Sequence, residues 1–338
     1  MKKASEATIL SKAIQFMSCQ RPEFVTVNKE VPQKKQVGIK LIASSLCNHS
    51  ELRSFYGNAD PGYGYAYPMK PGEPGHEGVG IVISKGEAVL DIDIGDTVVM
   101  AGHGGDECHQ SYVLKDSTSV AKIYPGDRNP AHASILEMFA CAHHCIRVLW
   151  NYGGYENKKV AIIGLGAIGL CSLMLLKLLP VKSITTIDIC EDKLKLAQQL
   201  KADHIYCILP DSSSADVKKV LGEFDVVIEC SGSASGQLLA YELACTSLIF
   251  ASYCPTPVLV KQSDLFNKNT TIFNPGIMTT DDLKAVANLY NNGLINPSAL
   301  ITKTILPEIT EYIQAIEEIR QGKIIKALID WSAYEAGS

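Results

Sequence analysis

The sequence lacks the features that mark several classes of protein. It has no run of lysine and arginine and a net charge of −5, so we do not expect a nucleic-acid-binding surface. Its longest apolar run, Gly169 to Pro180, is interrupted by Lys177 and is too short to span a bilayer. The first residues, MKKASEATILSKAIQF, lack the long apolar core of a signal peptide. These absences predict a cytoplasmic protein with no membrane partner.

Cysteine is plentiful but follows no pattern. The eleven cysteines are irregularly spaced, and no C-x-x-C pair occurs. This argues against a zinc ribbon or a four-cysteine structural zinc lobe. In a reducing compartment we expect most of these cysteines to be small buried hydrophobes, with one as a candidate metal ligand.

The chain does contain two kinds of sequence pattern. With 338 residues, 46% apolar and 20% charged, it is long enough for two globular domains. The first third consists of short β-branched segments separated by glycine and proline turns. Beyond about Ala131, strand and helix patterns alternate, which predicts an α/β domain with a parallel sheet covered on both faces. The last strand, KALIDW, is expected to rejoin the first domain.

A glycine-rich motif joins a buried strand to an apolar helix. In it, Gly164 permits a tight turn, Gly166 lets the backbone approach a pyrophosphate, and Gly169 lets the helix pack against the strand. The predicted dinucleotide-binding loop is Gly164, Leu165, Gly166, Ala167, Ile168 and Gly169. The alternative is a strand–turn–helix whose glycines serve packing alone.

The next strand, SITTID, ends in an acidic residue. Asp188 would accept hydrogen bonds from the adenosine ribose hydroxyls and repel a 2′-phosphate. No arginine follows closely, only Lys193. The pattern therefore favours NAD over NADP.

A histidine and a glutamate lie side by side in KPGEPGHEGVG, as His76 and Glu77. Cys47 follows an earlier strand, and Glu137 opens a later helix. Thiolate, imidazole and carboxylate groups are the ligands that zinc takes in catalytic sites, and zinc as a Lewis acid suits alcohol oxidation. The alternative is a Gly/Pro surface loop with incidental polar residues.

GHEGVGIVISKGEAV resembles the signature of the zinc-containing medium-chain alcohol dehydrogenases. Four other segments occur in the family's order along the chain: the LCN segment, GDTVV, LEMFACAHH and AIIGLGAIG. The resemblance runs from about Lys12 to Trp331. It implies a β-rich GroES-like catalytic domain over residues 1–137 and 277–338, and a Rossmann NAD-binding domain over residues 138–276. It also implies a homodimer or homotetramer.

The resemblance also implies roles for the candidate ligands. Cys47 and His76 match the first two catalytic zinc ligands. Glu77 is either a third ligand or lies just outside the coordination sphere. Glu137 stands where polyol dehydrogenases have glutamate, which indicates the sorbitol and threonine dehydrogenase branch.

The segment after Cys47 departs from the family pattern. It is one residue longer than the usual C-x-[ST]-D and carries Glu51 in place of aspartate. We assign Ser50 as the hydroxyl near the substrate and Glu51 as the acidic neighbour, while His49 and Ser50 could relay a proton. A second alignment places Asn48 in the ligand position, as in zinc-free quinone oxidoreductases.

We therefore expect one zinc per chain and NAD as cofactor. The expected reaction is hydride transfer between NAD(H) and a secondary alcohol or ketone, with a polar, polyol- or sugar-like small molecule as substrate. The tyrosines of a tyrosine- and glycine-rich loop, Tyr56, Tyr63, Tyr65 and Tyr67, could stack on a ring or donate to sugar hydroxyls, and the alternative is a mobile surface loop without that role. The alternatives are a zinc-free enone or quinone reductase and a dinucleotide-binding protein without turnover.

Overall fold

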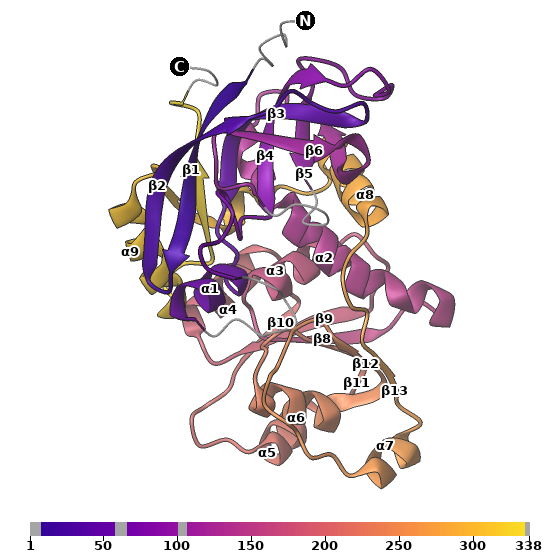
Figure 1. The fold of residues 1–338 in the computed structure, drawn as a ribbon. Helices are drawn as coiled ribbons and strands as arrows, with labels where there is room; N and C mark the ends of the chain where they lie inside the picture. The colour runs from indigo at the N-terminus through magenta and orange to yellow at the C-terminus, as the bar shows by residue number, and fades with distance from the viewer. Residues whose placement is uncertain (1–7, 58–65, 101–106, 335–338) are drawn as a thin grey trace, which may run out of the picture. The chain divides into compact units, whose positions relative to one another are not determined.

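The structure is a computed structural model that describes residues 8–57, 66–100 and 107–334. The chain forms two compact units (Figure 1). The first comprises Met1–Glu137 and Thr279–Ser338, and the second comprises Met138–Met278. In the described part of the chain, no helix is both long and apolar enough to cross a membrane.

The described part of the first unit is rich in strands, as the short β-branched segments predict. Its seven-stranded sheet has the order β14-β15-β3-β4-β5-β7, and β6 also pairs with β3. The bounds are β3 (Gln36–Ser45), β4 (Glu77–Lys85), β5 (Thr97–Met100), β6 (Tyr112–Asp116), β7 (Val120–Ile123), β14 (Ile301–Ile305) and β15 (Lys326–Asp330). A separate antiparallel pair consists of β1 (Ile9–Ser18) and β2 (Arg21–Lys29).

Three α-helices accompany these strands: α1 (Ser50–Tyr56), α8 (Thr280–Asn291) and α9 (Ile309–Arg320). Short 3-10 helices occupy Ser117–Ser119, Pro130–Ile135 and Pro297–Leu300. The core of the unit contains fully buried Phe16, Leu46, Tyr312 and Trp331. The expectation that KALIDW rejoins the first domain is confirmed, because β15 pairs antiparallel with β3.

The second unit is a six-stranded sheet in which every pair is parallel, with the order β10-β9-β8-β11-β12-β13 (Figure 1). Numbered within the unit this is 3-2-1-4-5-6, the doubly wound order, and the strand order reverses between β8 and β11. The strands are β8 (Lys159–Ile163), β9 (Ser183–Asp188), β10 (His204–Cys207), β11 (Phe224–Glu229), β12 (Ala244–Phe250) and β13 (Thr271–Phe273). The expected α/β fold is thus confirmed.

Helices connect the parallel strands, as such a sheet requires. They are α3 (Ala167–Leu176), α4 (Glu191–Gln199), α5 (Ser214–Leu221), α6 (Ala234–Leu243) and α7 (Gln262–Lys268). Before them, α2 (Leu136–Arg147) and a 3-10 helix at Val148–Tyr152 lead into β8. Buried apolar side chains of β8, β11 and α6, among them Ile163, Val227 and Leu239, pack in one core cluster.

Candidate metal centre and cofactor loop

Three of the candidate ligands meet at one end of the first unit's sheet. Strands β3 and β4 are antiparallel with Ser45 opposite Glu77, so the end of β3 lies beside the start of β4. Cys47 follows β3, His76 precedes β4, and their ligand atoms lie within 4.8 Å of one another and of a Glu77 oxygen. Among the described residues, these three form the group of His, Cys, Asp and Glu side chains suited to hold a metal ion.

The imidazole of His76 has a defined orientation. Its Nδ1 lies 3.0 Å from the carbonyl oxygen of Pro74, and because a carbonyl only accepts, Nδ1 carries the hydrogen. Nε2 is then the nitrogen that can bind a metal. Burial opposes the charged form of His76, but the Cys47 thiol and the Glu137 and Glu51 carboxylates outweigh it and raise the pKa well above its usual value.

Glu77 belongs to a buried ion pair. Its Oε1 accepts a hydrogen bond from Lys326 Nζ at 2.6 Å, and its Oε2 accepts one from the Ser45 hydroxyl. The Lys326 and Glu77 side chains are 1% and 2% exposed. Lys326 Nζ also donates to the Leu46 carbonyl at 2.6 Å. Burial disfavours the charged form of Lys326, but Glu77 and Cys47 raise its pKa. A buried ammonium group therefore contacts the Glu77 carboxylate of the three candidate ligands.

Nothing in the sequence indicated Lys326, because it lies 249 residues from Glu77 along the chain. Glu137 is the remaining candidate ligand. It lies in the first turn of α2, is 7% exposed, and contributes to the raised pKa of His76. Glu137 therefore lies near the three converging residues without belonging to their 4.8 Å group.

The segment after Cys47 distributes its side chains in several directions. The Asn48 amide donates to the Ile325 carbonyl at 3.0 Å, whereas Cys47 takes part in the group with His76. His49 is the residue before α1 and makes no side-chain capping hydrogen bond; its Nε2 lies 2.9 Å from an Arg53 guanidinium nitrogen. Ser50 is the first residue of α1.

Glu51 points into the interior and not toward solvent. Its Oε1 lies 2.8 Å from His109 Nε2, and the two side chains are 1% and 0% exposed. Burial raises the pKa of this carboxyl group, but the hydrogen bond and charge of His109 and the charge of His76 lower it on balance. No motif in the sequence pointed to His109, which lies just before β6.

The donor set suits zinc. One sulfur, one imidazole nitrogen and nearby carboxylate oxygens match the ligands of catalytic zinc sites, which hold the ion with three protein side chains. The candidate tyrosines are less informative. Tyr63 and Tyr65 lie outside the described residues. The hydroxyls of Tyr56 and Tyr67 donate to Glu317 and to the Ser54 carbonyl, and burial is the main cause that raises the pKa of Tyr67 to about 12.

The glycine-rich loop follows β8, at the edge where the strand order reverses. Gly164 has φ +89°, and a Cβ there would lie 2.6 Å from the Ser231 backbone, which follows β11. A Cβ on Gly169 would lie 2.0 Å from the Gly164 oxygen. Both positions therefore require glycine. A Cβ on Gly166 would meet no atom within 4 Å, so Gly166 leaves the start of α3 open to a ligand.

The other residues of the loop are arranged around this opening. Leu165 is buried, while Ala167 and Ile168 are the first residues of α3. Asp188 ends β9 and is 8% exposed. Its carboxylate accepts hydrogen bonds from the Leu165 N–H at 2.5 Å and the Cys190 N–H at 2.8 Å, which attaches the acidic residue to the loop. Lys193 lies in α4 and is partly exposed.

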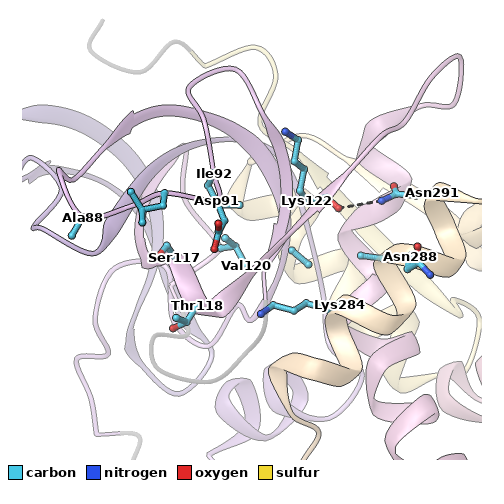
Figure 2. A pocket seen from close by; sticks show the side chains of 13 residues that line it. Ala88, Asp91, Ile92, Ser117, Thr118, Val120, Lys122, Lys284, Asn288 and Asn291 are labelled. Atoms are coloured by element: carbon cyan, nitrogen blue, oxygen red, sulfur yellow. Dashed lines mark hydrogen bonds between the residues drawn. The ribbon is translucent and has the colours of Figure 1, made fainter.

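A cavity of about 360 Å³ opens elsewhere in the first unit (Figure 2). Asp91, Thr118 and Lys284 are among the residues around it. It also contacts Ala88, which follows the end of β4 at Lys85, whereas Glu77 begins that strand. The cavity is therefore at the opposite end of β4 from the candidate metal centre and is not part of it.

Comparison with known proteins agrees with this geometry. The alcohol dehydrogenase GroES-like domain family matches residues 33–158, and the zinc-binding dehydrogenase family matches residues 167–292. The chain belongs to the zinc-type medium-chain alcohol dehydrogenase family. It is an oxidoreductase of that family, as expected.

Several relatives of this dehydrogenase are named for polyols. It is 23% identical to a sorbitol dehydrogenase of Halalkalibacterium halodurans, over 88% of this chain and 92% of that protein. It is 26% identical to galactitol 1-phosphate 5-dehydrogenase of Escherichia coli K12, over 65% of this chain and 68% of that protein. The crystal structure of galactitol-1-phosphate dehydrogenase from Escherichia coli superposes with a TM-score of 0.80 at 21% identity, covering 94% of this chain and 99% of that one.

Proposed function

We propose that this dehydrogenase transfers a hydride between NAD(H) and a secondary alcohol or its ketone at a single zinc ion. Cys47, His76 and Glu137 would hold the zinc, with Glu77 as a further ligand or as the residue just outside the coordination sphere. The observation that carries the proposal is the convergence of Cys47, His76 and Glu77 within 4.8 Å.

A zinc ion there supplies Lewis acidity, which lowers the pKa of an alcohol hydroxyl and so favours hydride loss from the carbon. The chain's own residues do the rest. His76 presents Nε2 because Pro74 holds Nδ1–H. Ser50, at the start of α1, accepts the substrate's proton by hydrogen bonding and passes it toward His49. Burial and the charge of Arg53 lower the pKa of His49, which favours its neutral imidazole. An Arg53 N–H donates to its Nε2 at 2.9 Å, so the relay requires this hydrogen bond to break when the proton arrives.

The second unit supplies the cofactor half of the proposal. NAD would place its pyrophosphate over Gly166 at the N-terminus of α3, where backbone N–H groups are free of helical partners. Asp188 would accept hydrogen bonds from the adenosine ribose, and Lys193 lies on the following helix. We further propose a polar, polyol-like substrate, which the names of the sorbitol and galactitol 1-phosphate relatives support.

The proposal also covers the domain ranges, the oligomeric state and the cellular compartment. We propose catalytic and cofactor domains over the ranges expected from the resemblance, and a homodimer or homotetramer in a reducing, cytoplasmic compartment. A reducing compartment is the one in which we expect most of the cysteines to be small buried hydrophobes. Strand β13 pairs only with β12 among the described strands, so its other edge is available to a second copy.

Zinc quantification combined with a substrate panel tests the function. We expect about one zinc per chain, loss of activity on chelation, and NADH formation with polyols or secondary alcohols. A metal-free protein that reduces enones or quinones would instead establish the zinc-free reductase. Zinc and NAD binding without NADH formation across the whole panel would identify a protein without turnover.

The role of Asp188 can be tested separately by Asp188→Asn. Loss of the charge should weaken NAD binding about tenfold, because a charge-assisted hydrogen bond to the ribose is lost. NADP should be affected much less, since its 2′-phosphate no longer meets a carboxylate. Fluorescence titration with both cofactors measures this. Asp203→Asn is the matched control, because Asp203 also accepts a backbone hydrogen bond in this sheet, from Ile184 at 2.8 Å. Equal weakening of NAD and NADP would contradict the assignment.

A further inference from the structure

Behind the candidate metal centre lies a buried hydrogen-bonded chain that the proposed chemistry does not use. Glu51 of α1 and His109 before β6 are joined at 2.8 Å between Oε1 and Nε2, 58 residues apart in sequence. Both side chains are fully buried. A carboxylate without water is strongly disfavoured unless a donor satisfies it, and His109 is that donor.

The direction of the hydrogen bonds follows from their two ends. Trp331 Nε1 donates to Ser44 Oγ at 2.9 Å, and Ser44 Oγ lies 3.0 Å from His109 Nδ1. An indole N–H only donates and a carboxylate only accepts. His109 therefore donates from Nε2 to Glu51, and in the neutral imidazole Nδ1 accepts the hydrogen of the Ser44 hydroxyl. The acceptor-only carboxylate thus selects the tautomer of His109, and Ser44 supplies the matching donor.

His109 also contacts the backbone that carries His76. A Cβ placed on Gly75 would lie 2.7 Å from the His109 ring, so the imidazole packs directly on the residue preceding His76. The adjoining backbone is hydrogen-bonded to the same loop, from the Cys108 N–H to the Gly75 oxygen at 2.7 Å and from the His109 N–H to the Gly72 oxygen at 3.1 Å. The edge of the ring also meets Tyr312, with centroids 5.7 Å apart.

The carboxylate that His109 holds belongs to the segment that carries Cys47. Glu51 lies in the first turn of α1, four residues after Cys47. The second oxygen, Oε2, is buried and has no hydrogen-bond partner among the residues that the structure describes. Only the contact with His109 therefore fixes the orientation of this carboxylate by hydrogen bonding.

We propose that His109 is a positioning residue of the candidate metal centre: through Nε2 it holds the Glu51 carboxylate at the start of α1, close after Cys47, and through its ring it supports the backbone at Gly75, next to His76. This inference rests on the proposed zinc function. Groups that orient metal ligands from behind commonly change metal affinity about 10- to 100-fold when they are replaced.

Two substitutions of similar size separate this role from simple filling of space. In His109→Gln the side-chain amide can take the place of Nε2 and still donate to Glu51. In His109→Asn the amide reaches only the Nδ1 position, so Ser44 keeps a partner and Glu51 loses its donor. Both variants lose the ring to the same extent.

The measurement is the zinc dissociation constant of each protein, by competition with a chromophoric chelator, with kcat and KM measured in parallel. We expect His109→Asn to bind zinc about 10- to 100-fold more weakly than the wild type, and His109→Gln to stay much closer to it. Ser44→Ala, which keeps the ring, should cause a smaller loss because Nδ1 loses its hydrogen-bond partner while Nε2 still donates to Glu51. Tyr155→Phe is the control, since it removes a buried hydrogen bond to Ile146 in the other unit.

The possible results discriminate between the two proposals. If the wild type binds zinc and the Gln and Asn variants have the same zinc affinity as each other, the Nε2 contact with Glu51 has no positioning role. The proposed function still stands in that case. If Ser44→Ala also leaves zinc affinity unchanged, the hydrogen-bonded chain is structural only. If the wild type does not bind zinc, the proposed function fails and the inference fails with it.

Discussion

Replacement of Cys47 by serine is expected to remove the zinc and to lower kcat/KM about a thousand-fold, because Lewis-acid stabilisation is worth several kcal/mol. Cys47 offers the sulfur in the group that includes His76 and Glu77. A serine hydroxyl at that position stays protonated at neutral pH and is a poor zinc ligand. Zinc content by atomic absorption and steady-state kinetics with NAD measure the effect.

Two matched variants make the Cys47 result specific. Cys207→Ser changes a half-buried thiol in the other unit and should leave zinc content unchanged. Asn48→Ala removes the hydrogen bond to Ile325 and should cost about 1 kcal/mol of stability with zinc retained. Full activity in a zinc-free Cys47→Ser protein, together with loss of activity in Asn48→Ala, would overturn the ligand assignment in favour of the zinc-free alignment.

Lys326→Met should destabilise the first unit by about 3–5 kcal/mol, because it leaves the buried carboxylate of Glu77 without its cation. The pair is 1% and 2% exposed, so water cannot replace the lost partner. Urea unfolding of the metal-free protein, followed by fluorescence, measures the change. Trp331 is fully buried in this unit, and a Trp150→Phe background removes the other tryptophan, which is 54% exposed.

The interpretation of Lys326→Met depends on two comparisons. Lys303→Met breaks a more exposed pair with Glu318, 2.7 Å long, and should cost less than about 1 kcal/mol. Adding Glu77→Gln to Lys326→Met should restore most of the lost stability, since the buried charge is then removed while Ser45 keeps an acceptor. If Lys326→Met costs no more than Lys303→Met, the ion pair contributes little to stability.

The cofactor loop could be read from the sequence because its determinants are local. Gly164, Gly166 and Gly169 occupy one strand–turn–helix, and the structure places them where β8 gives way to α3. The conformations that require glycine arise within a few residues, apart from the approach of Gly164 to Ser231. The alternation of strand and helix that predicted the parallel sheet is local in the same way.

Short elements were harder to recognise. The sequence analysis did not identify α1 or α7, which are seven residues each. Two turns of helix hold too few apolar positions to show a 3.6-residue period, and helices of this length are stabilised by tertiary contacts more than by propensity. The location of Ser50 and Glu51 in the first turn of α1, with His49 just before it, therefore required the structure.

The sequence was sufficient to predict the family, the α/β architecture and the candidate ligands Cys47, His76 and Glu137, because each depends on a short motif with its own chemistry. Only the tertiary structure showed how the charged side chains of the candidate metal centre are arranged. Lys326 reaches Glu77 because β15 pairs with β3, and His109 reaches Glu51 across 58 residues. Such partners leave no local pattern, since burial and hydrogen bonding select them after the strands have paired.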